Sequence, residues 1–173
     1  MKKEKSLGTN LKPLMALLAG KDGGIRQNAR ESLVALGKPA VSSLSKALKN
    51  SVLTQVRWES AKALDAIGSP RSIQPLVLAL ADKDRDVAWL AGEALSKFGK
   101  DAWPELLRAL IKGGADSALF RQGAHHVLCN QKVAGFDDLL PALLKDLESN
   151  AVREETMVIA NDIYRRLKQR PSS

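Results

Sequence analysis

The sequence predicts an all-α protein built as a solenoid, a superhelix of about five stacked helix-turn-helix repeats. A hydrophobic anchor residue recurs at spacings of 31, 31, 33 and 32 residues, at Ile25, Val56, Val87, Phe120 and Val152. Each anchor begins a stretch whose apolar residues follow the period of an α-helix. No stretch alternates apolar and polar residues for long enough to predict a strand.

The composition is that of one globular domain. The chain has 173 residues, of which 45% are hydrophobic and 27% charged, enough to bury a continuous core. Its single cysteine, Cys129, cannot form an internal disulfide, which favours a reducing, cytoplasmic setting. No run approaches the ~18 apolar residues of a membrane span. We therefore expect a cytoplasmic protein that does not enter a membrane.

The predicted second helix of each repeat begins at the anchor and buries two further positions. Offset 4 holds Ala29, Ser60, Ala91, Ala124 and Thr156, and offset 8 holds Leu33, Leu64, Leu95, Leu128 and Ala160. At about 100° per residue, the anchor and these two offsets lie within ~80° of one another and form one apolar stripe. Offset 12 is Gly37, Gly68 and Gly99 in the first three repeats, where a glycine favours the end of a helix.

A predicted first helix precedes each of these second helices. The five segments cover residues 11–20, 40–50, 73–84, 103–114 and 139–150, and four have a proline near their start, at Pro13, Pro75, Pro104 and Pro141. Trp103 precedes one of these prolines, and we expect it to pack against the core where its helix begins.

The domain organisation follows from these segments. We expect a flexible basic N-terminus over residues 1–10 and one solenoid domain over 11–170, with repeats at 11–37, 39–68, 70–99, 101–131 and 137–168. Residues 130–138 lack the glycine stop, which predicts an irregularity there.

The third repeat, IQPLVLALADKDRDVAWLAGEALSKFG, resembles the short HEAT-like repeats with the pattern PLxxLLxxxDxxVRxxAxxALxxIG, also found in phycobilin lyases and deoxyhypusine hydroxylase. The resemblance covers roughly residues 11 to 168 and implies a right-handed superhelix whose second helices line a concave groove. It also implies a structural ladder of arginines one residue after the anchors, at Arg26, Arg57, Arg121 and Arg153. Their implied partners are Asp22, Asp84, Asp86 and Asp116; a phosphate-binding row is the functional alternative.

Offsets 2, 6 and 9 lie opposite the apolar stripe and should project into that groove. They hold Gln27, Glu31, Val34, Trp58, Lys62, Asp65, Trp89, Glu93, Ser96, Gln122, His126, Cys129, Glu154, Val158 and Asn161. Trp58 and Trp89 occupy the same offset of neighbouring repeats, so they should lie side by side. They either pack between repeats as core or form the centre of a partner site ringed by Gln27, Glu31, Lys62, Glu93, Gln122 and His126.

The sequence gives little support for a metal, catalytic or cofactor site. His125, His126 and Cys129 are close in sequence, but a zinc site needs three or four protein ligands, so we expect no metal. Gly-rich phosphate loops and nucleophile elbows are absent from the sequence, so we expect no catalytic residues and no cofactor.

The net charge of +8 lies mostly at the chain ends, with +2 in residues 1–10 and +3 in 161–173, which makes nucleic acid a less favoured partner. The sequence therefore predicts a non-enzymatic scaffold that binds a protein or peptide in its groove. Two alternatives stay open: a nucleic-acid-binding or base-processing protein that stacks bases on the tryptophans, and an accessory subunit of a lyase-type enzyme.

Overall fold

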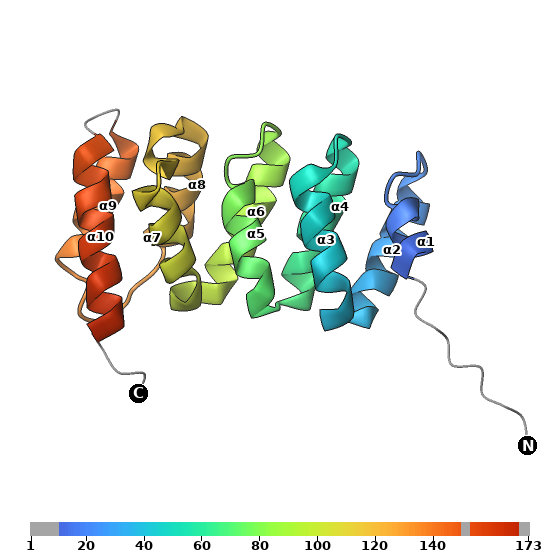
Figure 1. Ribbon diagram of the computed structural model, residues 1–173, viewed down its shortest axis with the longest axis horizontal. Helices are drawn as coiled ribbons and strands as arrows, with labels where there is room; N and C mark the ends of the chain where they lie inside the picture. Colours follow the sequence, from blue (N-terminus) through green and yellow to red (C-terminus); the bar gives the residue numbers. More distant parts are fainter. Residues whose placement is uncertain (1–10, 150–152, 170–173) are drawn as a thin grey trace, which may run out of the picture.

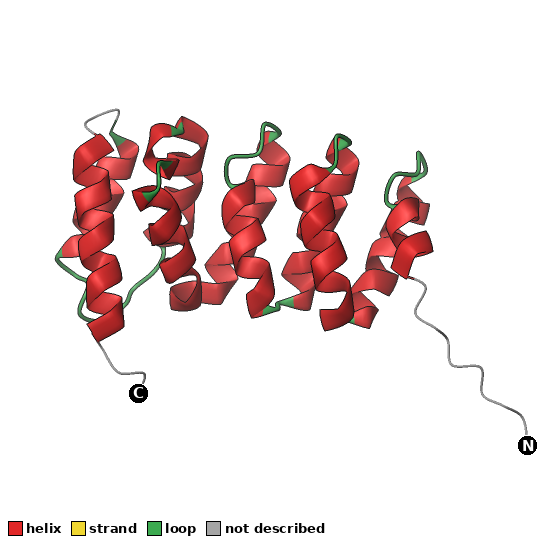
Figure 2. Ribbon diagram, viewed as in Figure 1, coloured by secondary structure: helices red, strands yellow, loops and turns green. Residues whose placement is uncertain are grey.

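The computed structural model describes residues 11–149 and 153–169 of the chain. It is an all-α solenoid, as predicted, in which helix pairs stand side by side in a row with α1 and α10 at opposite ends (Figure 1). Helices and loops make up the whole of the described part, without a strand (Figure 2). The expected flexible segment 1–10 lies outside the described residues.

Each pair consists of a first and a second helix along the chain. The first helices are α1 (Leu11–Leu17), α3 (Lys38–Asn50), α5 (Ile73–Ala79), α7 (Trp103–Ile111) and α9 (Leu139–Glu148). The second helices are α2 (Gly23–Leu36), α4 (Thr54–Ile67), α6 (Arg85–Phe98), α8 (Ala118–Cys129) and α10 (Arg153–Gln169). Short 3₁₀ turns lie at η1 (Pro70–Ser72), η2 (Gly99–Ala102) and η3 (Gly114–Asp116).

The second helices begin and end where local chemistry predicts. Asp84 accepts hydrogen bonds from the backbone N–H groups of Asp86 and Val87 at the start of α6, which satisfies donors that the helix itself leaves free. Helices α2, α4 and α6 end at glycines with φ of 67°, 59° and 54°, respectively. A side chain at such a φ would be strained, so the prediction that glycine ends these helices is confirmed.

Among the described residues, which do not include the fifth anchor Val152, the core follows the predicted apolar stripe with one exception. All residues at offsets 4 and 8 of the five second helices are buried, and each exposes 2% or less of its surface. The first anchor, Ile25, is 47% exposed, so the prediction that it is buried is wrong. Its helix, α2, is the first of its layer and packs on the next second helix from one side only, whereas α4 and α6 each lie between two such neighbours.

The two helices of the last pair lie in the opposite layers from those of the preceding pairs. In the preceding pairs, α3, α5 and α7 form one layer and α2, α4, α6 and α8 form the other. In the last pair, however, α9 packs against α8 and α10 packs against α7 (Figure 1). Glu154, Val158 and Asn161 of α10, expected on the same face as Trp89, therefore belong to the first-helix layer, which corrects that expectation.

The irregularity predicted at residues 130–138 is the connection that produces this reversal. Phe136 from this connection is fully buried and meets the fully buried Trp103 edge to face, with ring centroids 5.4 Å apart. Arg166 of α10 donates hydrogen bonds to the carbonyl of Gly135 (3.1 Å) and to both carboxylate oxygens of Asp138 (2.6 and 2.9 Å). The connection is thus held to the core and to α10, which leaves α9 beside α8.

A first prediction tests the helical phase of α6. Leu95→Ala should lower the free energy of unfolding by about 2–5 kcal/mol, because it empties a fully buried position. Glu93→Ala, which removes a surface carboxylate from the same helix, should cost less than about 1 kcal/mol. Urea unfolding of both variants makes the comparison, and similar costs would contradict the phase.

A second prediction concerns acid. The hydrogen bonds from Arg166 lower the pKa of the Asp138 carboxyl from 3.8 to about 2. A carboxyl with a lowered pKa stabilises the fold above its unfolded pKa, and this stabilisation disappears as the pH falls from about 3.8 towards 2. Carboxyl titration by NMR should therefore give a midpoint near 2 for Asp138, and Arg166→Gln should return it towards 3.8. An unchanged midpoint in the variant would contradict the assignment.

Candidate partner-binding face

The outward sides of α2, α4, α6 and α8 form what we call the second-helix face, and Trp89 is its most exposed large apolar residue. Trp89 is 58% exposed, and its ring lies on the ring of His126 from α8, with centroids 4.3 Å apart at a tilt of 34°. The Nε2 of His126 lies 2.7 Å from Oε1 of Glu93. These three side chains join α6 to α8 at the surface.

A cavity of about 290 Å³ opens beside this group. Its inner end is formed by the buried Leu80 and by two helix-interior glycines, Gly92 and Gly123, while Arg85 and Gln122 are exposed residues of its lining. A Cβ atom on Gly92 would lie 3.0 Å from Cδ2 of His126, and one on Gly123 would lie 2.9 Å from Cδ2 of Leu80. Glycine at these two positions therefore leaves the space that the His126 ring and the Leu80 side chain occupy.

This cavity is smaller than most pockets that enclose a drug-sized ligand, which have volumes of about 300–1,000 Å³. An apolar floor below an exposed indole suits one side chain of a partner better than a whole cofactor.

Trp58 differs from Trp89 in its burial and in the cavity that it lines. It is half-buried against the core, and the Nζ of Lys62, one turn along the same helix, lies 4.4 Å from the centroid of its ring. It lines a separate cavity of about 390 Å³ whose other walls include Glu59, Asp84 and Asp86. Trp58 and Trp89 lie on the neighbouring helices α4 and α6 but line separate cavities, and the aromatic pair expected from the sequence stays a prediction.

The other predicted site residues divide between these places. Trp89, Gln122 and His126 line one cavity, with Glu93 bound to His126, whereas Trp58 and Lys62 lie together on α4. Gln27 and Glu31 are exposed on α2, and the Gln27 amide donates to the Glu31 carboxylate at 2.9 Å. They line neither cavity.

The sequence analysis missed the cavity floor. Leu80, Gly92, Leu119 and Gly123 were not assigned to the site, although they complete the cavity beside Trp89. A glycine inside a helix costs about 1 kcal/mol relative to alanine, so two such glycines in neighbouring second helices were the signal for a close approach.

The side chains of His125, His126 and Cys129 each contact a different group. His125 Nε2 lies 2.9 Å from a carboxylate oxygen of Glu148, and His126 faces Glu93. Cys129 is exposed, and its thiol lies 3.3 Å from the carbonyl oxygen of His126. Within residues 11–149 and 153–169, no three His, Cys, Asp or Glu residues are grouped so that they could hold a metal ion.

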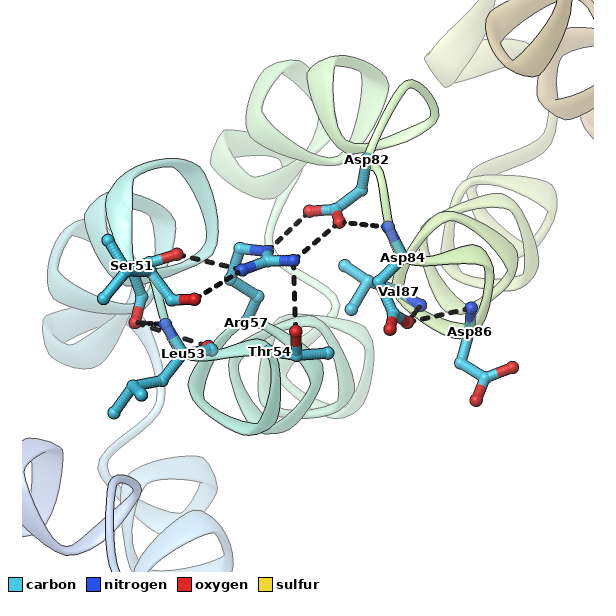
Figure 3. A network of polar contacts seen from close by, with 9 residues as sticks. Ser51, Leu53, Thr54, Arg57, Asp82, Asp84, Asp86 and Val87 are labelled. Carbon is cyan, nitrogen blue, oxygen red and sulfur yellow. Dashed lines mark hydrogen bonds and ion pairs between the residues drawn. The ribbon is translucent and has the colours of Figure 1, made fainter.

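Arg57 is the most fully engaged of the arginines predicted to form a ladder (Figure 3). It is 4% exposed, and it donates to both carboxylate oxygens of Asp82, at 2.8 and 2.9 Å, and to the carbonyl of Ser51 at 3.0 Å. The hydrogen bonds to Asp82 raise the pKa of the guanidinium. Arg57 thus ties the turn before its own helix to the turn of the next repeat.

Two other ladder arginines also bind the turn that precedes their helix. Arg26 donates to the carbonyls of Gly20 and Lys21, both at 2.9 Å, and Arg121 donates to the carbonyl of Ala115 at 2.6 Å. The side chain of Arg153 lies outside the described residues. Because these guanidiniums are directed at turn carbonyls, the geometry does not favour a phosphate-binding row.

The carboxylate partner of Arg57 differs from those implied by the resemblance. Arg57 pairs with Asp82 rather than with Asp84 or Asp86. Asp22 and Asp84 instead cap the starts of α2 and α6, where backbone N–H groups compete for their oxygens.

Comparison with known proteins agrees with this architecture. Paired helices stacked in one direction define an α-solenoid, the class of protein to which repeat scaffolds belong. A family model for HEAT repeats matches residues 41–129, from α3 to the end of α8, and the chain belongs to the HEAT-repeat family. Searches of curated proteins and of solved structures gave no match.

HEAT repeats commonly serve as protein-interaction modules, and the family is typically non-enzymatic. None of the described helices combines the length and the apolarity needed to cross a membrane.

A third prediction tests the buried ion pair. Arg57→Met should lower the free energy of unfolding by about 3–5 kcal/mol, because it leaves the Asp82 carboxylate without its main partner. Lys97→Met is the matched control: it breaks the solvent-exposed pair with Asp65 and should cost less than about 1 kcal/mol. Equal costs in urea unfolding would show that the Arg57 pair behaves as a surface pair.

Proposed function

We propose that this protein is a non-enzymatic interaction module that binds a protein or peptide through its second-helix face, with one apolar side chain of the partner inserted beside Trp89. The observation that carries the proposal is the 58% exposure of Trp89 at the edge of a cavity with an apolar floor. Tryptophan is seldom left in water, and burying it on binding releases a large apolar area.

The surroundings of Trp89 support a binding site for a polypeptide. Arg85 and Gln122 give the cavity mouth hydrogen-bonding groups, whereas Leu80 and the two glycines give it an apolar base. A desolvated aromatic centre with a polar rim is the usual arrangement of the residues that dominate binding energy in protein interfaces. His126 holds the indole in one orientation before the partner arrives, which reduces the entropy lost on binding.

The cavity beside Trp58 offers a second contact of different character. Asp84 and Asp86 line it together with Arg26 and Glu59, which pair with each other, so a partner group that enters it should be cationic or a hydrogen-bond donor. The same carboxylates repel phosphate, which argues against single-stranded nucleic acid lying across both tryptophans. We therefore infer that a peptide combining an apolar side chain with a nearby Lys or Arg fits the two cavities best.

A fourth prediction tests this site with peptides selected from a random phage-displayed library on the wild-type protein. Trp89→Ala should weaken binding of the selected peptides by about 2 kcal/mol or more, because it removes the aromatic wall of the cavity. Its melting temperature should stay close to that of the wild type, since the indole is mostly exposed. Fluorescence anisotropy and thermal melting measure the two effects.

The matched control is Val158→Ala, which shortens an exposed apolar side chain of α10 outside the second-helix face. It should change neither binding nor melting. Selected peptides that bind Trp89→Ala as tightly as the wild type would contradict the proposal. Single-stranded DNA that binds more tightly than these peptides, with an affinity that falls steeply with salt, would favour the nucleic-acid alternative.

A further inference from the structure

A groove with a single sign of charge lies in the other layer of the solenoid, between α3 and α5. Its volume is about 540 Å³, and we call it the basic groove. Four of its lining residues are cationic, namely Lys38, Lys46, Lys49 and Arg71, and none is acidic. It shares no residue with the cavity beside Trp89, so the two sites are independent.

The helical phase of α3 brings its cations together. At about 100° per residue, Lys38, Lys46 and Lys49 fall within about 80° of one another, so they occupy one side of the helix. Lys38 and Lys49 are eleven residues apart, which corresponds to about 16 Å along the helix axis. Arg71 faces them from η1, immediately before α5.

These cations have no acidic partner in the part of the chain that the structure describes. The sequence supplies none nearby, because no Asp or Glu occurs in residues 32–58 or 66–81. Elsewhere in the fold cations come with carboxylates: Arg30 pairs with Glu59, and Lys97 pairs with Asp65. Four like charges around one groove repel one another, and an anionic occupant would remove that repulsion.

The floor of the groove is apolar. Val41 is buried beneath it, and Leu78 of α5 is 46% exposed at its edge, next to Pro75. Ser42 and Gln74 add exposed hydrogen-bonding groups. A bare phosphate ion would use the cations and leave the leucine in water, whereas a peptide can offer carboxylates and an apolar side chain together.

The arginine of the following first helix is already paired. On the following first helix, α7, Arg108 is paired with Glu105 at 2.7 Å and donates to the hydroxyl of Tyr164 at 3.1 Å. A nucleic-acid duplex needs phosphate contacts along a longer track. We propose that the basic groove binds an acidic peptide segment, whose carboxylates meet Lys38, Lys46, Lys49 and Arg71 while an apolar side chain covers Leu78.

The test uses a fluorescein-labelled peptide of sequence Glu-Glu-Leu-Glu-Glu-Leu-Glu-Glu and a control peptide with Gln in place of every Glu. Anisotropy should show binding of the Glu peptide at low ionic strength, weakening as salt is added, and at least about tenfold weaker binding of the Gln peptide. The double variant Lys46→Glu/Lys49→Glu should weaken binding of the Glu peptide at least about tenfold. Leu78→Ser, which leaves the charge unchanged, should weaken it about threefold or more.

The matched control is Lys100→Glu/Lys145→Glu, which changes the net charge equally at two exposed lysines outside the groove. It should keep the affinity of the Glu peptide within about twofold, because charges farther away than the Debye length of about 8 Å are screened in physiological salt. Circular dichroism verifies that all variants fold.

Equal losses in the groove and control variants, or no binding of the Glu peptide to the wild type, would overturn the proposal. Single-stranded DNA or phosphatidylserine vesicles could instead bind more tightly than the Glu peptide and lose that binding in the same groove variants. Such a result would overturn the assignment to a peptide and show that the groove binds that other anion. Trp89→Ala should leave binding of the Glu peptide unchanged, so failure here is distinguishable from failure of the second-helix site.

Discussion

The structure depends on the contacts that the second helices α2, α4, α6 and α8 make in succession. Small residues at offset 4, such as Ser60 and Ala91, let the helices approach, and leucines at offset 8, such as Leu64 and Leu95, fill the space between them. With these offsets turned inward, offsets 2 and 6 stay at the surface, and offset 2 of one helix can reach offset 6 of the next. Trp89 and His126 meet in this way, whereas Glu93, at the offset that could face Trp58, is bound to His126 instead.

The turns are held together by a separate set of polar contacts. Arg57 joins two turn carbonyls and Asp82 of the following repeat, so consecutive turns are linked through one buried guanidinium. Glu59 takes the corresponding place one repeat earlier, where it lies 2.5 Å from Arg30 and 3.5 Å from Arg26. The first three repeats are thus bound to one another by packing along their helices and by these ion pairs, and both contacts reach only the adjacent repeat.

The sequence predicts most of the repeated features, because each is local and occurs several times: the helices, their glycine ends and the buried offsets. It does not predict the reversal of α9 and α10. Thr156 and Ala160 are buried as their offsets predict, but an apolar stripe specifies only that one side of a helix is covered, not which neighbour covers it. That choice depends on Phe136 and Arg166, whose contacts with Trp103 and Asp138 link parts of the chain that no local pattern connects. The cavity beside Trp89 was missed for a related reason, since its floor combines the end of α5 with glycines inside α6 and α8.

The reversal also separates the two surfaces of the solenoid. Because α10 packs on α7, its Tyr164 receives a hydrogen bond from Arg108, and Lys168 lies 4.9 Å from the centroid of the Tyr164 ring. This helix closes the first-helix layer at the C-terminal end of the row and adds the exposed Arg165 and Lys168 to that layer, apart from the basic groove between α3 and α5. Because the core uses only the inward offsets, residues on the two outer sides are free to differ in chemistry. The chain therefore presents an aromatic cavity with a polar rim on one side and a groove whose charged residues are all cationic on the other.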